Sequence, residues 1–80
     1  MKYELYKEVV LRKDFPEKKL KKGDVATVVE YHPSKTSDDG YSLEVFNALG
    51  DTIAVLTVSE LDIEILKKSE VFSVRPLEVA

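Results

Sequence analysis

The chain has 80 residues, of which 44% are hydrophobic and 34% charged, and its formal net charge is −3. These values are typical of one small folded domain and exclude a disordered segment. There is no cysteine, which excludes a disulfide, a thiolate metal site and a cysteine nucleophile. No apolar run approaches the roughly 20 residues of a membrane span, and residues 1–10 lack the apolar region of a signal peptide. We therefore expect a single domain over residues 1–80, in the cytoplasm and without a membrane partner.

The first third of the chain predicts a strand, a basic loop and a second strand. The first strand is expected over residues 6–11. Pro16, which cannot donate a backbone hydrogen bond, predicts an irregular loop over residues 14–22. Leu20 stands among four lysines, so we expect its side chain to fix this loop to the core while the lysines stay in water.

The second strand is expected over residues 24–31, directly after a Gly-Asp pair. Gly23 can adopt a positive φ, and Asp24 can cap the turn with its own side chain. Val28 and Val29 are adjacent and apolar, which breaks the alternation of a half-buried strand. Their pattern indicates either a strong bend or burial on both faces.

The middle of the chain predicts a hairpin after a polar loop at residues 34–40. Alternating apolar residues predict a third strand over 41–46, with Tyr41 in the core, and Gly50 predicts a tight turn over 47–51. The fourth strand, over 52–58, is almost wholly apolar or β-branched, so we expect it to lie centrally in the sheet.

The last third predicts less regular structure. Ser59, with Asp62 three residues later, predicts a single helical turn at residues 59–61. Residues 63–66 form either a short strand or an extended link, and residues 67–70 a polar turn. Alternation predicts the last strand over 71–76, followed by a tail at 77–80.

Five short strands with one helical turn before the last predict an all-β fold, specifically a small five-stranded SH3-like barrel. The alternative is an OB-like barrel. That fold needs a helix between the third and fourth strands, and the sequence between Phe46 and Thr52 is too short to provide one.

Residues spread over nearly the whole chain match, in order and spacing, the pattern of a known family. They are Phe15-Pro16, Leu20, Gly23-Asp24, Thr27-Val28-Val29-Glu30, Tyr41, Glu44, Gly50, Thr52, Ala54-Val55, Thr57, Glu70-Val71 and Ser73-Val74-Arg75. In these residues the chain resembles a family of small, mostly bacterial proteins, domain-of-unknown-function family 4926. The resemblance implies an SH3-like barrel with no established activity and no catalytic residues. Some relatives are encoded beside toxin-like proteins, which suggests an antitoxin or immunity role by association.

The residues that catalysis or metal binding would need are scarce. The three glycines lie far apart and form no phosphate-binding loop, and His32 is the single histidine. Asp38-Asp39 is expected to form a turn rather than a calcium loop, and one histidine next to a proline does not predict a Ser-His-Asp triad. We therefore expect a protein that is not an enzyme and has no cofactor or metal.

Charge is distributed unevenly along the chain. Residues 12–22 carry six basic and two acidic side chains, a local charge of +4, whereas residues 38–80 carry nine acidic and three basic ones, a local charge of −6. The basic segment is either a solvated loop or a contact patch for a partner. The candidate contact residues are Arg12, Lys13, Lys18, Lys19, Lys21 and Lys22.

Aromatic residues at strand ends predict a second candidate surface. Tyr31, His32 and Phe46 lie at the ends of the second and third strands, where aromatics of an SH3-like barrel can line a peptide groove. For Phe46 the alternative is packing in the hairpin. An exposed strand edge offers a third route to association, because a second copy can add to it.

Two function hypotheses follow. The first is a non-enzymatic binding module that recognises a protein partner, as an antitoxin-like, immunity-like or regulatory subunit, and is a monomer or weak homodimer. The alternative is an RNA-binding accessory protein, because a basic loop before residues 23–31 is similar to the KOW motif. Against RNA binding, the pI is about 5.1, and aromatic residues for base stacking are not interleaved with the lysines.

Overall fold

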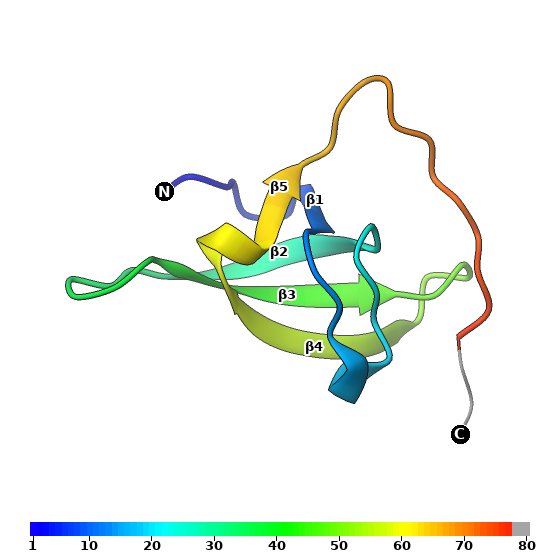
Figure 1. The fold of residues 1–80 in the computed structure, drawn as a ribbon, viewed down its shortest axis with the longest axis horizontal. Helices are drawn as coiled ribbons and strands as arrows, with labels where there is room; N and C mark the ends of the chain where they lie inside the picture. Colours follow the sequence, from blue (N-terminus) through cyan, green and yellow to red (C-terminus); the bar gives the residue numbers. More distant parts are fainter. Residues whose placement is uncertain (78–80) are drawn as a thin grey trace.

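Residues 1–77 form a single antiparallel sheet of five strands with two short helical turns, as a computed structural model of the chain shows (Figure 1). The structure describes residues 1–77. The strands are β1 (Glu8–Leu11), β2 (Val25–His32), β3 (Gly40–Phe46), β4 (Thr52–Ser59) and β5 (Ile63–Ile65). The 3-10 turns are η1 (Pro16–Lys18) and η2 (Glu60–Asp62). The predicted all-β class is confirmed.

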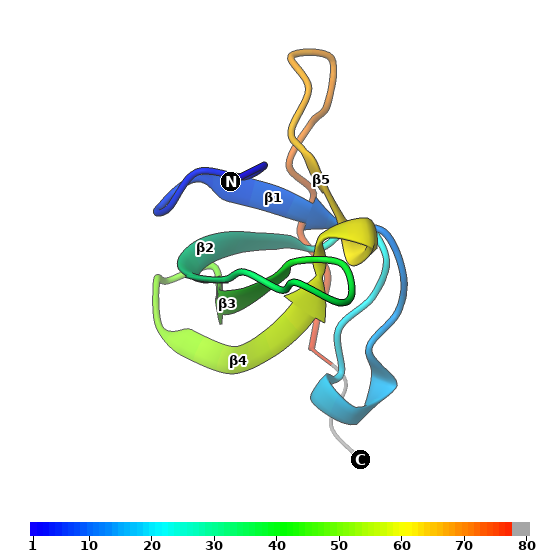
Figure 2. The ribbon, with the colours of Figure 1, turned by 90° about the vertical axis from the view of Figure 1, so that its left-hand side faces the viewer.

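The strand order is β4-β3-β2-β1-β5, so β1 to β4 form a meander and β5 returns to the far side of β1. The sheet curls strongly (Figure 2). It does not close, because β4 and β5 are its two edges and do not pair with each other within residues 1–77. The structure therefore supports a curved five-stranded sheet, and the predicted closed barrel is not confirmed.

The core lies on the concave side of this sheet and follows the period-two pattern of β3. Tyr41, Leu43 and Val45 are buried, while Ser42 and Glu44 between them stay partly exposed. The Tyr41 hydroxyl accepts hydrogen bonds from the backbone amides of Lys2 and Tyr3, at 2.9 and 3.0 Å. The prediction that Tyr41 belongs to the core is confirmed, and its hydroxyl also holds the N-terminal segment in place.

A bulge in β2 explains the adjacent apolar residues of this strand. Val28 pairs with Leu43 of β3, but Glu30, not Val29, pairs with the next residue, Ser42. Val29 is thus an extra residue on β2, and bulges of this kind bend a strand and increase its twist. Of the two alternatives that the sequence leaves open, this bulge supports the bend.

The basic loop contains more structure than its sequence suggests. Pro16 opens η1, where its missing amide is no loss because the first helical N–H groups have no internal partner. Phe15 and Leu20 flank this turn and exchange two backbone hydrogen bonds, at 2.9 and 3.1 Å. Leu20 is buried to 2% exposure, which confirms that it fixes the loop to the core.

Strand β4 lies at an edge of the sheet, and the prediction that it is central was wrong. Its pairing with β3 covers one side, and its other side has no neighbouring strand within residues 1–77. Leu56 and Val58 face the core, but Val55 is 55% exposed. The apolar run therefore does not reflect burial on both faces.

The fifth strand is not the predicted one. Residues 63–65 pair with β1, with Val9 opposite Ile65 and Leu11 opposite Ile63. These residues follow directly after η2 and are therefore closer along the chain to the free edge of β1 than residues 71–76 are. The predicted strand at 71–76 is irregular and exposed. Of the predicted tail, residues 78–80 lie outside the described part of the chain.

The helical turn before β5 is confirmed together with its cap. The Ser59 hydroxyl accepts the Leu61 amide at 3.1 Å, and the Asp62 carboxylate accepts the Ser59 amide at 3.2 Å. This reciprocal pair is the capping box that the sequence predicts. It fixes the corner at which the chain leaves β4 for β5.

Candidate binding groove and basic loop

Residues 66–77 form an extended segment that we call the C-terminal arm. The arm leaves β5, arcs away from the sheet and returns on the side of the molecule where the β3–β4 turn lies (Figure 1). Its bend is the polar turn predicted at residues 67–70, in which the Glu70 amide donates to the Lys67 carbonyl at 3.0 Å. The Glu70 carboxylate in turn accepts the Lys67 amide at 2.6 Å.

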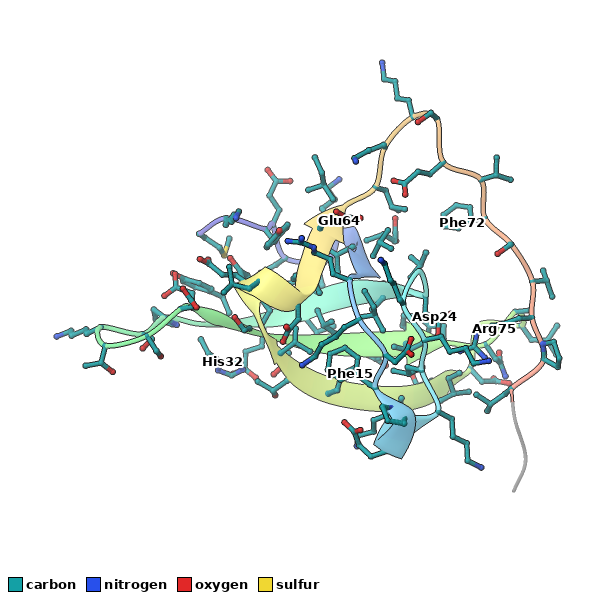
Figure 3. All side chains as sticks on the ribbon, in the orientation of Figure 1. Phe15, Asp24, His32, Glu64, Phe72 and Arg75 are labelled. Carbon is teal, nitrogen blue, oxygen red and sulfur yellow. The ribbon has the colours of Figure 1, made fainter. Side chains whose placement is uncertain are left out.

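A groove of about 880 Å³ lies between the arm and the body of the protein. Its lining comes from β1, β2, the β3–β4 hairpin and the arm. The principal apolar residues of this lining are Val10, Val25, Phe46, Ile53, Phe72 and Leu77. Phe46 is 43% exposed and Phe72 is 72% exposed, and the Phe72 ring lies on the side of the arm that faces the sheet (Figure 3). The groove thus presents apolar surface to solvent on both of its walls.

The end of the arm is attached to the body by an ion pair between Arg75 and Asp24 (Figure 3). Arg75 Nε donates to Asp24 Oδ1 at 2.9 Å, and Nη2 donates to Asp24 Oδ2. The same Nη2 donates to the Lys19 carbonyl at 3.2 Å. This geometry is bidentate, which is the strongest and most directional arrangement that a guanidinium makes with a carboxylate.

Asp24 is also held by its own loop. Its carboxylate accepts the Lys21 amide at 2.8 Å, which confirms the side-chain cap, and Gly23 has the predicted positive φ of 95°. Burial alone would raise the pKa of Asp24. The hydrogen bonds from Arg75 and from the Lys21 amide outweigh burial, so the pKa lies below its ordinary value of 3.8. Asp24 is therefore an ionised anchor for the arm at neutral pH.

The basic loop keeps its charged side chains on the surface, next to the groove. The predicted contact residues Arg12, Lys18, Lys19, Lys21 and Lys22 are all exposed. The loop's two aspartates hold its backbone, because Asp14 accepts the Lys22 amide at 2.8 Å as Asp24 accepts that of Lys21. Leu20, Gly23 and Asp24 of this loop also line the groove, so Lys21 and Lys22 follow and precede lining residues in the sequence.

Lys13 differs from the other basic residues of this segment. Its ammonium group lies 3.8 Å from the Asp62 carboxylate and 5.2 Å from the centre of the Phe15 ring. These contacts connect the basic loop to η2 and to the core, so Lys13 has a structural role that its sequence position did not indicate.

The predicted aromatic surface does not form one site. Tyr31 and His32 pair with Tyr41 and Gly40 at the start of β3, whereas Phe46 ends the same strand. Six residues of extended chain separate the two ends by about 20 Å. Phe46 belongs to the groove, and Tyr31 packs its ring against Tyr41, with ring centres 5.3 Å apart.

Tyr31 and His32 have separate polar partners. The Tyr31 hydroxyl donates to Asp39 at 2.6 Å, and this hydrogen bond raises the pKa of Tyr31 to about 12. The same hydrogen bond, with one from the Ser34 amide, holds the pKa of Asp39 below its ordinary value. His32 Nε2 lies 2.7 Å from Ser42 Oγ and 3.7 Å from Glu30 Oε1.

The contacts of His32 do not have the geometry of a hydrolase triad. In a triad the carboxylate orients one ring nitrogen while the serine hydroxyl bonds to the other. Here serine and carboxylate both approach Nε2, and the His32 side chain is 41% exposed. Within residues 1–77 there is no cluster of three or more histidine, cysteine or carboxylate residues able to hold a metal. No helix in the same range is long and apolar enough to cross a membrane.

Comparison with known families decides where the chain belongs. The family model described as domain of unknown function DUF4926 matches residues 5–74. The chain is a member of the DUF4926 family. No curated protein and no solved structure matches it. The match covers all five strands and both sides of the groove, and it ends one residue before Arg75.

The sequence does not predict the groove, although it singles out some of the lining residues, among them Leu20, Asp24 and Phe46. The sequence predicts Phe46 on a different surface, with Tyr31 and His32, and a strand over residues 71–76 because Phe72 and Val74 alternate with polar Ser73 and Arg75. One feature of the sequence does indicate that the arm contacts the body. Arg75 lies in an apolar stretch, and a charged side chain there needs a partner elsewhere in the fold.

Proposed function

We propose that this DUF4926 protein is a non-enzymatic binding module that recognises a protein partner through the groove under its C-terminal arm. The observation that carries the proposal is the exposure of apolar side chains on both walls of the groove, Phe46 and Ile53 on one side and Phe72 on the other. Contiguous exposed apolar surface with a charged rim is typical of protein contact sites.

The fold that we propose for this module is an open variant of the SH3-like arrangement. Its support is the meander of β1 to β4, the 3-10 turn after β4 and the return of β5 to β1. In this arrangement a groove at the end of the sheet is a natural place for an extended peptide. The arm then acts as a second wall that can adjust to the partner.

The biological role within this proposal is an antitoxin-like, immunity-like or regulatory subunit. Its support is the resemblance to relatives encoded beside toxin-like proteins, together with the lopsided charge of the chain. The exposed lysines of the basic loop favour an acidic partner surface through long-range attraction. We propose the cytoplasm as its location, because a sequence without cysteine suits a reducing compartment.

Site-specific crosslinking in the organism that encodes the chain tests this function. A photoreactive phenylalanine analogue is placed at position 72, inside the groove, and in a control at Lys35, in the loop between β2 and β3. We expect a discrete crosslinked protein from position 72 and none from position 35. We further expect Phe46→Asp to abolish that crosslink. Equal products from both positions, or none from position 72, would contradict the proposal.

The alternative function, RNA binding, draws support from one feature, the exposure of Lys18, Lys19, Lys21 and Lys22 on a single loop. Lysines so placed can neutralise phosphates. Fluorescence anisotropy with a pool of labelled single-stranded RNA tests it, at low and at physiological salt. Salt-sensitive binding that a four-lysine-to-alanine variant loses would favour RNA over a protein partner. Absence of binding at low salt would reject it.

A further inference from the structure

Strand β4 presents an edge of unusual character. It spans Thr52–Ser59, and its free side is the outermost edge of the sheet (Figure 2). Its sequence, TIAVLTVS, contains no charged residue, no proline and no glycine. Proteins commonly protect an edge strand with lysine, proline or a short length, because unpaired backbone groups are a template for another strand. None of these three devices is present in β4.

The other edge of the sheet is protected in the ordinary way. Strand β5 has three residues, Ile63–Ile65, and contains Glu64. Each of the strands β1, β2 and β3 also contains a glutamate, namely Glu8, Glu30 and Glu44. Within residues 1–77, β4 is therefore the one strand without a charge, and it is also the longer of the two edges.

The backbone groups of β4 that face outward can be assigned from the ladder. The Glu60 amide donates to the Asp39 carbonyl at 2.8 Å, directly before the β3–β4 pairing begins. Hydrogen-bonded and non-hydrogen-bonded pairs alternate in an antiparallel ladder. This alternation directs the backbone groups of Val58 and Leu56 toward β3 and those of Val55 and Thr57 toward the free edge.

We propose that two copies of this chain pair through their β4 edges, antiparallel and about a twofold axis, to form one continuous sheet. In the register that uses the outward groups, Val55 of each copy exchanges two backbone hydrogen bonds with Thr57 of the other. Leu56 then lies opposite its own counterpart, next to the two cores. The groove under the C-terminal arm takes no part, so this inference is independent of the proposed function.

A second copy is the occupant that the strand itself favours. An antiparallel pair of identical strands is self-complementary about a twofold axis, as an isologous interface requires. Because β4 has no charge, self-pairing brings no like charges opposite each other, and Val55 meets Thr57, a pairing of two β-branched residues. A partner strand with charged side chains would find no opposite charge on β4 to pair with.

The pairing is weak and depends on salt. A single strand edge buries less than the roughly 1,200 Å² of a stable interface, so we expect a dissociation constant on the order of 0.1 mM. Each copy carries a net charge of −3, which opposes association. Screening by salt should therefore strengthen the dimer between about 0.02 and about 0.5 M salt, the opposite of the trend expected for RNA binding.

Sedimentation equilibrium of the full chain, combined with nuclear magnetic resonance, tests the inference. We expect a monomer–dimer equilibrium, with amide shifts that depend on protein concentration at Val55 and Thr57 but not at Phe72. A chain that stays monomeric up to about 1 mM would overturn the proposal. Shifts confined to the arm would overturn it as well, because they would place the contact in the groove.

Matched substitutions on the two edges complete the test. Val55→Lys adds to β4 the charge it lacks and should weaken the dimer by about tenfold or more. Thr57→Lys is a second variant of the same edge, used if the first changes the fold as judged by circular dichroism. Ile65→Lys makes the same kind of change on β5, at a residue that is 62% exposed, and should leave the equilibrium unchanged. Equal effects on both edges would refute the assignment to β4.

Discussion

Arg75 and Asp24 stand 51 residues apart in the sequence and meet as a bidentate ion pair at the end of the C-terminal arm. Their side chains are 29% and 19% exposed, so the pair is partly shielded from water. The side chains of Val71 and Val74, by contrast, are each 90% exposed. The position of the arm thus depends on charge and hydrogen bonding at one point more than on apolar packing along its length.

Arg75→Ala should release the arm without unfolding the sheet. The variant removes two charge-assisted hydrogen bonds to Asp24, and we expect the free energy of unfolding to fall by about 1 kcal/mol. Hydrogen exchange should accelerate in residues 71–77 and stay unchanged in β3. Arg12→Ala, an exposed residue of the basic loop, is the control. Slow exchange in the arm of the Arg75 variant would show that other contacts hold it.

Acid should release the arm as well. The pKa of Asp24 is lower in the folded protein than its ordinary value of 3.8, so its ionised form stabilises the fold. That stabilisation is complete above the ordinary pKa and is lost as the pH falls through the lower, folded value. Between about pH 5 and about pH 2, the protection of arm amides, that is, their exchange rate relative to the intrinsic rate at the same pH, should fall in the wild type. In Asp24→Asn this protection should be low at every pH, whereas protection that does not change with pH in the wild type would contradict the assignment.

Tyr31 should titrate late because its hydroxyl donates to Asp39. Its pKa is raised from 10.0 to about 12, so the protonated hydroxyl stabilises the fold fully below pH 10.0, and this stabilisation is lost as the pH rises toward 12. Ultraviolet absorbance of tyrosinate should show a step for Tyr31 at about pH 12. Tyr31→Phe should remove this step, Asp39→Asn should move it to lower pH, and Tyr6→Phe should leave it in place.

Leu20→Ala should destabilise the protein although Leu20 lies in a loop. The side chain is 2% exposed, and truncation of a buried leucine costs about 2 to 5 kcal/mol in unfolding free energy. Urea unfolding measures the loss. Leu49→Ala, at a residue of the β3–β4 turn that is 90% exposed, should change stability by less than about 0.5 kcal/mol. Similar losses in the two variants would mean that Leu20 does not fix the basic loop to the core.

Local signals in the sequence were sufficient for several elements of the fold. The alternation around Tyr41, the Gly23-Asp24 turn and the Ser59 cap each depend on a few neighbouring residues, and each is confirmed. Gly50 likewise has the positive φ expected of its turn, at 91°.

Two predictions were wrong, the strand at residues 71–76 and the central position of β4. Both concern where a segment lies relative to the edges of the sheet. Residues 71–76 have the alternation of a strand, but Ile63–Ile65 occupy the edge of β1, and Arg75 holds the arm at Asp24 and not along the free edge of β4. The apolar run of β4 predicts a central strand, but burial on both faces and an unprotected edge produce the same apolar pattern. Composition alone does not distinguish these two cases.

The candidate sites depend on distances that the sequence does not contain. Tyr31 and Phe46 both end strands, yet their separation follows from the register of β2 and β3, which pairs Tyr31 with Tyr41. The groove requires the path of the arm, which is set by the contact of Arg75 with Asp24. The basic loop, in contrast, was predictable because its residues are contiguous in the chain.

The bulge makes Val29 the residue of β2 whose deletion would leave the other side chains on their present faces of the sheet. Strand side chains alternate between the two faces, and a bulge adds one unpaired residue to this alternation. With Val29 present, Tyr31 packs on the core and Glu30 points outward. Deleting Val29 would leave Val28 opposite Leu43 and Glu30 opposite Ser42 in a regular ladder, so Glu30 would still point outward and Tyr31 would still pack on the core. The loss would be the local bend and the added twist of β2, so position 29 sets the curvature of the sheet and not the faces of its side chains.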